Sequence, residues 1–401
     1  MPSKGRALAG VLVLDMSRIL AGPSATQMLG DLGATVIKIE NPKTGGDDTR
    51  TWGPPYYETP DGNSDLSAYY NAVNRNKHSV VADISTPEGR DLILSIADQA
   101  QVLIENYKPG GLKKYGLDFD TLIARNPALV YCSITGFGQT GPNAAKPGYD
   151  LMAQGYGGVM SITGDFDGPP TKVGVGIADI MCGMHATVGI LAALRHADAT
   201  GEGQQIDLAL VDSQMAWLAN QGTNYLASGV SPVRRGNAHP NIVPYCVYPT
   251  QTGHIILAVG NDSQFQAFCT AMGRVDLSID PRFVTNPLRI QHREALDVLV
   301  TETFATKSSA DILHSLQDAG VPCGPINTVE QALTSDQAQA RGAVVTLADP
   351  NVVDGAVNLL GNPLKLSKTP VTYRKPPPRL GDDMDQLDAV LAAHRAERSK
   401  T

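Results

Sequence analysis

The stretch VLVLDMSRILAGPSATQMLGDLGATVIKIE, residues 11–40, decides the fold of this chain. It begins with a short apolar run, VLVLD (11–15), which predicts a buried strand. The turn-rich segment SRILAGPS follows, then a helix that extends through Gln27 and Leu32, then a second strand, TVIKIE (35–40). Strands separated by helices form right-handed βαβ units, so this stretch predicts a parallel sheet.

The same alternation continues through the first half of the chain. The segment STPEGRDLILSIADQA predicts a helix with Thr86 as its N-cap, Pro87 at its first position and Glu88 near the positive end of its dipole. The further predicted elements are strands at 101–106, 128–138 and 205–211, and helices in LDFDTLIARNP and at about 180–197. The predicted fold class is α/β, with a Rossmann-like large domain built on a parallel sheet.

The pattern changes after about residue 225. A loop rich in Pro, Gly and Asn leads into two strand-like runs joined at Gln251–Gly253, which predicts a β-hairpin, and helical segments follow it. We therefore expect a smaller α+β domain over residues 225–325. Residues 1–224 and 326–401 are expected to form the large domain together, from both ends of the chain.

Composition and charge exclude several classes of protein. The chain has 401 residues, 42% of them hydrophobic and 18% charged, which is typical of a globular protein long enough for two domains. Its net charge of −8 argues against a nucleic-acid partner. The N-terminus lacks the features of a signal peptide and no run of about 18 apolar residues occurs, so no membrane partner is expected. Five widely spaced cysteines without a CxxC pair suit a cytoplasmic location.

The sequence lacks the residue spacing of several common cofactor-binding and catalytic motifs. The first strand is not followed by G-x-G-x-x-G, and GVGIAD (174–179) places Ala178 and Asp179 where the third glycine would stand, so no NAD site is expected. The sequence contains no P-loop motif and no G-x-S-x-G, which argues against a P-loop enzyme and a serine hydrolase. Its eight histidines do not form H-E-x-x-H, and no metal centre is expected.

Asp179 has the local setting best suited to chemistry. Apolar residues at helical spacing begin directly after it, so it lies at or next to a helix N-cap, where backbone N–H groups and the dipole favour an ionised carboxylate. Glycines at 174, 176 and 183 would allow a bulky ligand to approach the backbone. These residues alone leave two interpretations open, a capping carboxylate and a nucleophile.

A set of basic residues is the second candidate feature. These residues follow the ends of predicted strands, where open α/β sheets bind ligands. Their positive charges would suit the phosphates of an anionic ligand. The alternative is that these are ordinary solvated side chains. The set consists of Arg18, Lys38, Arg75, Lys77, Lys108, Lys113 and Lys114.

In their order along the chain, these motifs resemble the class III CoA-transferases, a family that includes formyl-CoA transferase, carnitine CoA-transferase and the α-methylacyl-CoA racemases. The resemblance is carried by VLDMSRILAGPSATQMLGDLGATVIKIE, NRNKHSVVADISTPEGRD, LIENYKPGGLKKYGL, GYDLMAQGYGGVMSITG, ADIMCGMHATVGILAAL and TGEGQQIDLALVDS. It continues in RGNAHPNIVPY and GVPCGPINTVEQAL. The loop RGNAHPNIVPY is most similar to that of the succinyl-CoA-dependent dicarboxylate or hydroxy-acid transferases.

The resemblance implies an acyl-CoA:carboxylate CoA-transferase with coenzyme A as co-substrate and Asp179 as the catalytic residue. The CoA-binding residues that it implies by position are Ser17, Arg18, Asp83, Asn106, Tyr107, Lys108, Lys114 and Lys146. The substrate-side residues that it implies are Trp52, Tyr69 and Tyr149. Residue type and loop position make Arg235 and His239 candidates to contact the distal carboxylate of the acceptor acid. Relatives form interlocked homodimers, so the resemblance also implies a homodimer.

The mechanism that the resemblance implies is covalent. Asp179 would form an aspartyl–acyl anhydride and then an aspartyl–CoA thioester. Backbone N–H groups near Gly155–Gly158 or at the helix start are candidates to stabilise the oxyanions. Racemases of the family need a second acid or base where this chain has Tyr149, and a pKa near about 10 favours transfer over racemisation. A 2-methylacyl-CoA racemase and a non-catalytic CoA-binding protein remain as alternatives.

Overall fold

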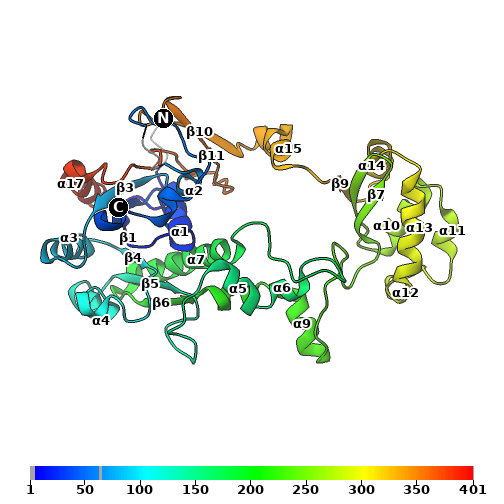
Figure 1. Ribbon diagram of the computed structural model, residues 1–401, viewed down its shortest axis with the longest axis horizontal. Coiled ribbons are helices and arrows are strands. Elements are labelled where there is room, and N and C mark those ends of the chain that lie inside the picture. Colours follow the sequence, from blue (N-terminus) through cyan, green and yellow to red (C-terminus); the bar gives the residue numbers. More distant parts are fainter. Residues whose placement is uncertain (1–4, 63–65, 401) are drawn as a thin grey trace. The chain divides into compact units, whose positions relative to one another are not determined.

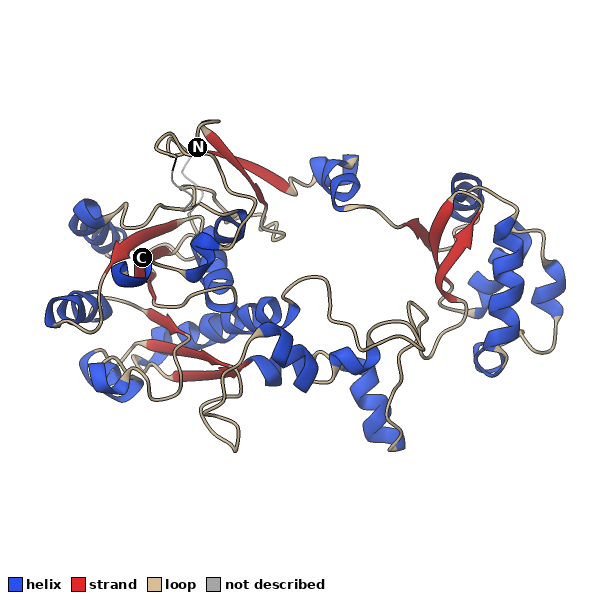
Figure 2. Ribbon diagram, viewed as in Figure 1, coloured by secondary structure: helices blue, strands red, loops and turns tan. Residues whose placement is uncertain are grey.

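A computed structural model describes residues 5–62 and 66–400 of the chain. The chain divides into two compact units, drawn in Figure 1 and Figure 2. The larger unit consists of the residues up to Val159, Lys172–Val230 and the residues from Asp336 onward, and the smaller unit of Met160–Thr171 and Ser231–Ser335. The boundaries expected from sequence lie at 224/225 and 325/326, and they leave 160–171 in the large domain.

The larger unit is built on a parallel sheet. Among the described residues this sheet has six strands, in the spatial order β3 (Lys77–Val81), β2 (Thr35–Glu40), β1 (Leu12–Asp15), β4 (Val102–Glu105), β5 (Val130–Thr135) and β6 (Gln205–Ala209). Val13 of β1 pairs with Val36 and with Val102 on its two sides. This order is that of doubly wound nucleotide-binding folds, so the predicted α/β class with a parallel sheet is confirmed.

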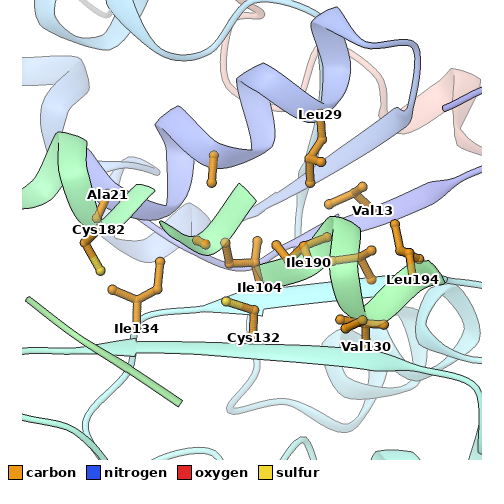
Figure 3. Packing of buried hydrophobic residues seen from close by; sticks show 14 of the residues in the cluster. Val13, Ala21, Leu29, Ile104, Val130, Cys132, Ile134, Cys182, Ile190 and Leu194 are labelled. Carbon is orange, nitrogen blue, oxygen red and sulfur yellow. The ribbon is translucent and has the colours of Figure 1, made fainter. Parts of the chain in front are cut away.

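Helices cover both faces of this sheet, as Figure 1 shows. One face is covered by α1 (Ala21–Asp31) and α7 (Ile177–Thr200), and the other by α3 (Pro87–Ala97), α4 (Phe119–Arg125) and α17 (Leu387–Arg398). Successive strand residues point to opposite faces, so Val13 packs in the first core whereas Leu12 and Leu14 pack in the second. Figure 3 shows the first core.

The remaining helices of this part of the chain are short. They are α2 (Ala68–Ala72), α5 (Asp150–Tyr156), α8 (Leu210–Ala216), α9 (Ala219–Ser228) and α16 (Asp336–Ala340). A further short helix, α6 (Val159–Ile162), begins at the last residue of a larger-unit segment and continues in the smaller unit. Turns of 3-10 helix cover Pro42–Thr44, Asp48–Thr51, Lys113–Tyr115 and Met384–Gln386.

Helix α7 packs closely on α1 because of Gly183. A Cβ atom at this position would lie 2.2 Å from Ser24 Oγ and 2.6 Å from the carbonyl oxygen of Ala21, so only glycine permits this approach. Among the described residues, α7 is the one helix long and apolar enough to cross a membrane. Its Cys182 and Ile190 are buried in the first core, which is the environment of a domain's central helix (Figure 3).

Local sequence signals fix several element boundaries. The Thr86 hydroxyl accepts a hydrogen bond from the Gly89 N–H at 3.1 Å, and Pro87 is the first residue of α3, as predicted. β6 ends at Ala209, before the predicted end at 211, because α8 begins at the next residue. β3 has no counterpart among the predicted elements, since the charged Lys77 begins it and interrupts the apolar pattern.

The C-terminal segment completes the larger unit. β10 (Val344–Ala348) and β11 (Ala356–Leu360) form an antiparallel hairpin, and Leu359 packs with Leu66 and Tyr70. The Asn362 side chain donates a hydrogen bond to the buried carboxylate of Asp31 at the end of α1. The C-terminal segment therefore packs against residues from the N-terminal part of the larger unit.

The smaller unit has its own sheet and core. β7 (Tyr245–Thr250), β8 (Gly253–Ala258) and β9 (Cys323–Pro325) pair antiparallel, and the hairpin predicted at Gln251–Gly253 is confirmed. Its core contains Phe265, Phe268 and Phe304. The helices of this unit are α10 (Asp262–Ala271), α11 (Val275–Ile279), α12 (Asn286–Gln291), α13 (Arg293–Ala305), α14 (Ser309–Asp318) and α15 (Val329–Thr334).

Candidate active site

Two cavities lie along the carboxyl edge of the parallel sheet in the larger unit. The Asp179 cavity and the Asp83 cavity, named after one lining residue each, both have a volume of about 270 Å³. Arg18 and Tyr107 line both of them, so the two cavities adjoin along this edge. It is the edge at which open α/β sheets bind ligands.

Asp179 lies in the first turn of α7 and lines its cavity. The N-cap of the helix is Gly176, which has no side chain to cap the free N–H groups. The carboxylate of Asp150 takes this role, because its Oδ2 accepts hydrogen bonds from the N–H groups of Ala178 at 2.8 Å and Asp179 at 3.2 Å. The helix cap expected at or next to Asp179 is therefore supplied by another segment.

Asp150 is itself held by a buried glutamine. The Gln154 side-chain amide donates to Asp150 Oδ1 at 2.5 Å, and its carbonyl oxygen accepts the Val173 N–H at 2.8 Å. Gln154 is fully buried, and its burial strengthens these hydrogen bonds. This chain of contacts joins α5 to the start of α7 and fixes the backbone that carries Asp179.

The electrostatic environment of Asp179 differs from the one expected for a helix cap. Burial, and then the negative charge of Asp150, raise the pKa of Asp179 to about 7. The sequence-based expectation that the helix start keeps this carboxylate ionised was wrong, because Asp150 occupies the N–H groups that would have favoured the charge. The result is a half-buried carboxyl group that titrates near neutral pH.

The expected oxyanion donors are already engaged in other hydrogen bonds. The N–H groups of Gly157 and Gly158 donate to carbonyl oxygens at the end of α5, at 2.8 and 3.4 Å. Those of Ala178 and Asp179 donate to Asp150. These four N–H groups are therefore engaged in other hydrogen bonds in this structure.

The loop after β1 forms one wall of the Asp179 cavity. The side-chain amide of Asn106 binds the backbone of Arg18 twice, accepting from its N–H at 3.0 Å and donating to its carbonyl oxygen at 2.8 Å. The Arg18 guanidinium pairs with the exposed Asp48 at 2.8 Å. Asn106 therefore orders the loop through the backbone, while the Arg18 side chain stays at the surface of both cavities.

Two glycines form another part of the wall. A Cβ atom on Gly136 would lie 2.5 Å from the Gly148 Cα, and one on Gly148 would lie 2.2 Å from the Gly136 Cα. The two backbones therefore touch directly, which only glycine permits. This contact sets the position of the segment that leads into Tyr149 and Asp150.

The Asp83 cavity carries charge of both signs. The Asp83 carboxylate pairs with Lys43 at 2.6 Å and accepts the N–H and hydroxyl of Ser85. The Lys43 ammonium and the Ser85 contacts lower the pKa of Asp83 to about 2, so this group is ionised at neutral pH. Lys43, which the sequence did not single out, lies at the rim with an exposed side chain.

Most of the CoA-binding residues implied by the resemblance meet at this edge. The Asp179 cavity is lined by Arg18, Asn106, Tyr107, Lys108 and Lys146, together with Tyr149 from the substrate-side set. Two of the implied residues line neither of the two cavities. The buried Ser17 hydroxyl donates to Asp15 at 2.5 Å, and the Lys114 ammonium lies over the Tyr115 ring at 4.7 Å.

Three residues of the predicted basic set are not part of an exposed cationic surface, although Lys38 lines the Asp83 cavity. Lys38, Arg75 and Lys77 are buried, and they pair with Asp47, Asp31 and Asp15 at 2.8, 2.6 and 3.2 Å. That part of the cationic-surface hypothesis was wrong, since a buried lysine or arginine is retained in proteins chiefly where a carboxylate compensates it. The exposed part of the set consists of Arg18, Lys108, Lys113 and Lys114.

Trp52 and Tyr69 form an aromatic pair, with ring centroids 5.3 Å apart in an edge-to-face arrangement. Burial, followed by the charges of Asp179, Asp150 and Asp47, raises the pKa of Tyr69 to about 12. The phenol is therefore a hydrogen-bond donor at neutral pH, within the electrostatic reach of Asp179. Trp52 is half exposed beside it.

Arg235 and His239 belong to the smaller unit, which holds a cavity of about 440 Å³. Arg235, His292 and Arg293 line this cavity. His239 does not, and its Nδ1 accepts the Asn241 N–H at 3.1 Å. Burial and then Arg293 lower the pKa of His239, so it is a neutral hydrogen-bonding group rather than a cation near pH 7.

Metal ligands do not cluster in the described parts of the chain. No group of three or more His, Cys, Asp or Glu side chains that could hold a metal ion occurs within residues 5–62 and 66–400.

The family model of CoA-transferase family III matches residues 8–384 of the chain. The sheet-edge cavities and Asp179 thus lie inside the matched region. The chain belongs to this family and is an enzyme, a CoA-transferase.

Similar proteins agree with this assignment. The chain is 50% identical over 394 residues to the succinate–glutarate CoA-transferase of Agrobacterium fabrum, covering 98% of this chain and 97% of that one. It is 40% identical to the human (Homo sapiens) succinyl-CoA:glutarate CoA-transferase, over 93% of this chain and 83% of that one. A crystal structure of a CAIB/BAIF family protein from Brucella suis superposes with a TM-score of 0.83 at 46% identity, covering 95% and 98% of the two chains. These relatives do not favour the racemase alternative.

Proposed function

We propose that this enzyme transfers CoA from succinyl-CoA to a short dicarboxylic acid such as glutarate, through covalent intermediates on Asp179. The observation that carries the proposal is the half-buried Asp179 carboxyl group, which lines a cavity at the ligand edge and titrates near pH 7. The names of the two transferase relatives support the choice of acids.

The proposed reaction has four steps. The ionised Asp179 attacks the carbonyl of succinyl-CoA, giving an aspartyl–succinyl anhydride and CoA thiolate. The thiolate then attacks the aspartyl carbonyl, which releases succinate and leaves an Asp179–CoA thioester. The carboxylate of the acceptor attacks this thioester, giving a second mixed anhydride and the thiolate again. The thiolate finally attacks the acceptor's acyl carbonyl, which forms the new acyl-CoA and restores the Asp179 carboxylate.

The Asp150 charge favours formation of the first covalent intermediate. Free Asp179 bears a negative charge beside the Asp150 carboxylate, whereas the anhydride and the thioester at Asp179 are neutral. The first step therefore relieves a repulsion between like charges, and the last step restores it. A raised pKa also makes the ionised carboxylate a stronger nucleophile than an ordinary one.

We place CoA along the two adjoining cavities. Lys43 and Arg18 would meet the phosphates, with the thioester end beside Asp179. Lys108 and Lys146 would add positive charge at the rim of the Asp179 cavity. An edge lined with cations on an acidic protein gathers an anionic ligand locally.

For the acceptor we propose that the second carboxylate binds arginine. Arg235 and Arg293 line one cavity of the smaller unit, and guanidinium groups bind carboxylates in a planar, two-point arrangement. His239 would add a hydrogen-bond donor through Nε2, since its Nδ1 accepts from Asn241. The Trp52 and Tyr69 pair would contact the acyl chain near Asp179.

The covalent mechanism is tested by trapping. The enzyme is incubated with succinyl-CoA and hydroxylamine, digested, and examined by mass spectrometry, and a hydroxamate on the peptide that contains Asp179 is expected. Asp179→Asn should lose both the adduct and transfer by at least about a thousandfold. Asp388→Asn, at an exposed position in α17, is the matched control. Full transfer by Asp179→Asn would disprove the mechanism.

The acceptor class is tested with acids of equal chain length. Glutarate and valerate each have five carbons, and only glutarate has a second carboxylate. We expect kcat/KM for glutarate to exceed that for valerate by at least about a hundredfold, and Arg235→Gln to reduce this preference. Equal use of both acids would reject the dicarboxylate assignment. Loss of solvent-exchangeable α-deuterium from 2-methylacyl-CoA tests racemisation in the same preparations.

We also propose that the chain forms a homodimer and acts in the cytoplasm. The dimer is supported by apolar side chains that α5 and α7 leave exposed, among them Met152, Met184 and Val188. Light scattering should give a mass of about twice the 42.4 kDa of one chain. Cell fractionation tests the location.

A further inference from the structure

The loop after β1 contains a residue in an unfavourable backbone conformation. Ile19 has φ of 74°, in the left-handed region, where a β-branched side chain is a genuine outlier. Ile19 follows Arg18 directly, and both line the Asp179 cavity. Such a residue persists only where its surroundings hold it in place, and such residues cluster at functional sites.

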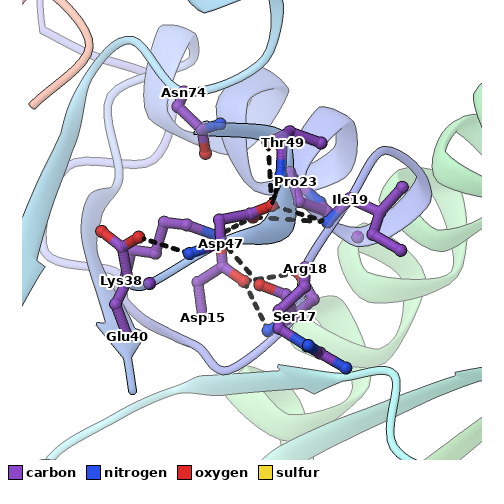
Figure 4. Close-up of polar contacts among 12 residues, drawn as sticks. Asp15, Ser17, Arg18, Ile19, Pro23, Lys38, Glu40, Asp47, Thr49 and Asn74 are labelled. Carbon is purple, nitrogen blue, oxygen red and sulfur yellow. Dashed lines mark hydrogen bonds and ion pairs between the residues drawn. The ribbon is translucent and has the colours of Figure 1, made fainter. Parts of the chain in front are cut away.

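Three side chains from other elements hold the backbone of residues 17–19, one residue each. The Lys38 ammonium donates to the Ser17 carbonyl oxygen at 2.9 Å. Asn106 binds the N–H and carbonyl oxygen of Arg18. The Asp47 carboxylate accepts the Ile19 N–H, at 3.2 Å to Oδ1 and 3.3 Å to Oδ2. Figure 4 shows Lys38 and Asp47 beside Ser17 and Ile19.

Asp47 and Lys38 form one buried unit beneath the loop. Their charged atoms lie 2.8 Å apart, and both side chains are fully buried. Asp47 also accepts the N–H of Thr49 at 3.0 Å and its hydroxyl at 2.8 Å, so each of its oxygens is engaged. A buried ion pair with every oxygen satisfied is rigid, and it fixes the groups that bind to it.

We propose that Asp47, supported by Lys38, is a positioning residue that holds Ile19 in its left-handed conformation and thereby shapes the cavity wall for the CoA thioester. The identity of the ligand in this inference rests on the proposed function. Asp47 and Lys38 line the adjoining Asp83 cavity but not the Asp179 cavity, whose wall Asp47 reaches through the backbone of Ile19. The contacts of Lys38, Asn106 and Asp47 fall on three consecutive residues of the loop. Contacts that served only the stability of the fold would not need to be gathered on one short segment.

The inference predicts an energetic coupling between residues 47 and 19. Glycine adopts positive φ without penalty, whereas alanine keeps the Cβ atom that makes the conformation unfavourable. Asp47→Asn removes the charge but leaves the shape of the side chain. It should therefore weaken ligand binding in the wild type and in the Ile19→Ala background, and much less in the Ile19→Gly background.

Binding of free coenzyme A, measured by calorimetry, is the test, because it does not depend on turnover. We expect Asp47→Asn to raise the Kd by about tenfold in the wild-type and Ile19→Ala backgrounds, and by less than about threefold with Ile19→Gly. An equal effect in the Ile19→Gly and Ile19→Ala backgrounds, or no effect of Asp47→Asn, would overturn the proposal. If instead transfer fails while this coupling is observed, the proposed function fails and the positioning role stands.

Two controls keep the test decisive. Asp31→Asn disrupts another buried ion pair of the larger unit, with Arg75, and should change the Kd equally in the Ile19→Gly and Ile19→Ala backgrounds. If Asp47→Asn does not fold, the Tm values of the single variants Ile19→Gly and Ile19→Ala are compared instead. Ile19→Gly should have a higher Tm than Ile19→Ala, by about 2 °C, because the position favours glycine. The opposite order of Tm values would overturn the proposal.

Discussion

The Asp150 carboxylate accepts the backbone N–H of Asp179 at 3.2 Å and that of the preceding Ala178 at 2.8 Å. One carboxylate thus caps the helix on which another carboxylate stands. Asp150 interacts with the positive end of the helix dipole. The pKa of Asp179 is therefore set mainly by burial and by the negative charge of Asp150. This relationship connects the geometry of the site to its pH dependence.

The first prediction concerns the Asp150 charge. Asp150→Asn keeps an oxygen that can accept the two N–H groups but removes the negative charge, so the ionised form of Asp179 becomes easier to reach and its pKa falls. The acid limb of the profile of kcat/KM against pH should move down by about 0.5–1 pH unit. Asp388→Asn on the exposed side of α17 should leave the profile unchanged. An acid limb that stays in place would contradict the role given to Asp150.

The second prediction concerns stability. The folded-state pKa of Asp179, about 7, lies above its unfolded value, so the folded chain holds this proton more tightly between about pH 4 and 7. The stability of the wild type therefore falls as the pH rises through this window. Asp179→Asn has no such proton. Its free energy of unfolding should therefore exceed that of the wild type by about 2 kcal/mol at pH 8, after allowance for solvent screening.

This gain is measured as the difference in unfolding free energy between variant and wild type at pH 5 and pH 8. The variant that abolishes catalysis is expected to be the more stable protein at pH 8, a trade-off typical of active sites. A difference that is independent of pH would show that Asp179 titrates normally in the folded chain.

The third prediction concerns the contact between Gly136 and Gly148. Gly136→Ala places a Cβ atom 2.5 Å from the Gly148 Cα, where no side chain can move aside. The segment before Asp150 must shift, and we expect a loss of at least about 2 kcal/mol of stability together with a tenfold or larger rise in KM for the CoA thioester, on the order of what small misplacements cause. Gly324→Ala, in β9 of the smaller unit, is the control, since nothing lies within 4 Å of its Cβ position.

The fourth prediction uses two glycines of α7. A Cβ atom on Gly183 would clash with Ser24 and Ala21, whereas one on Gly189 would meet the Ile206 side chain at 3.5 Å, an ordinary contact. Gly183→Ala should therefore lower the Tm, and Gly189→Ala should raise stability by about 0.5–1 kcal/mol through helix propensity. Thermal unfolding of the two variants is the measurement. The same sign of change in both would contradict the close packing of α7 on α1.

The sequence by itself determined the features that depend on neighbouring residues. Alternating apolar strands and amphipathic helices predicted the parallel sheet, Thr86 and Pro87 predicted the start of α3, and the turn at Gln251–Gly253 predicted the hairpin. The ordered motifs predicted the family and placed Asp179 at the start of a long helix. These signals are local because capping, turn chemistry and hydrophobic periodicity act within a few residues.

Only the tertiary structure decided which groups meet across the chain. It buried Lys38 against Asp47, brought Gly136 against Gly148, and set Asp150 at the start of α7, 29 positions away in sequence from Asp179. The pKa of Asp179 follows from its burial and from the nearby Asp150 charge, because both depend on distance in space and not along the chain. The sequence could therefore name the catalytic candidate, while its electrostatic state required the fold.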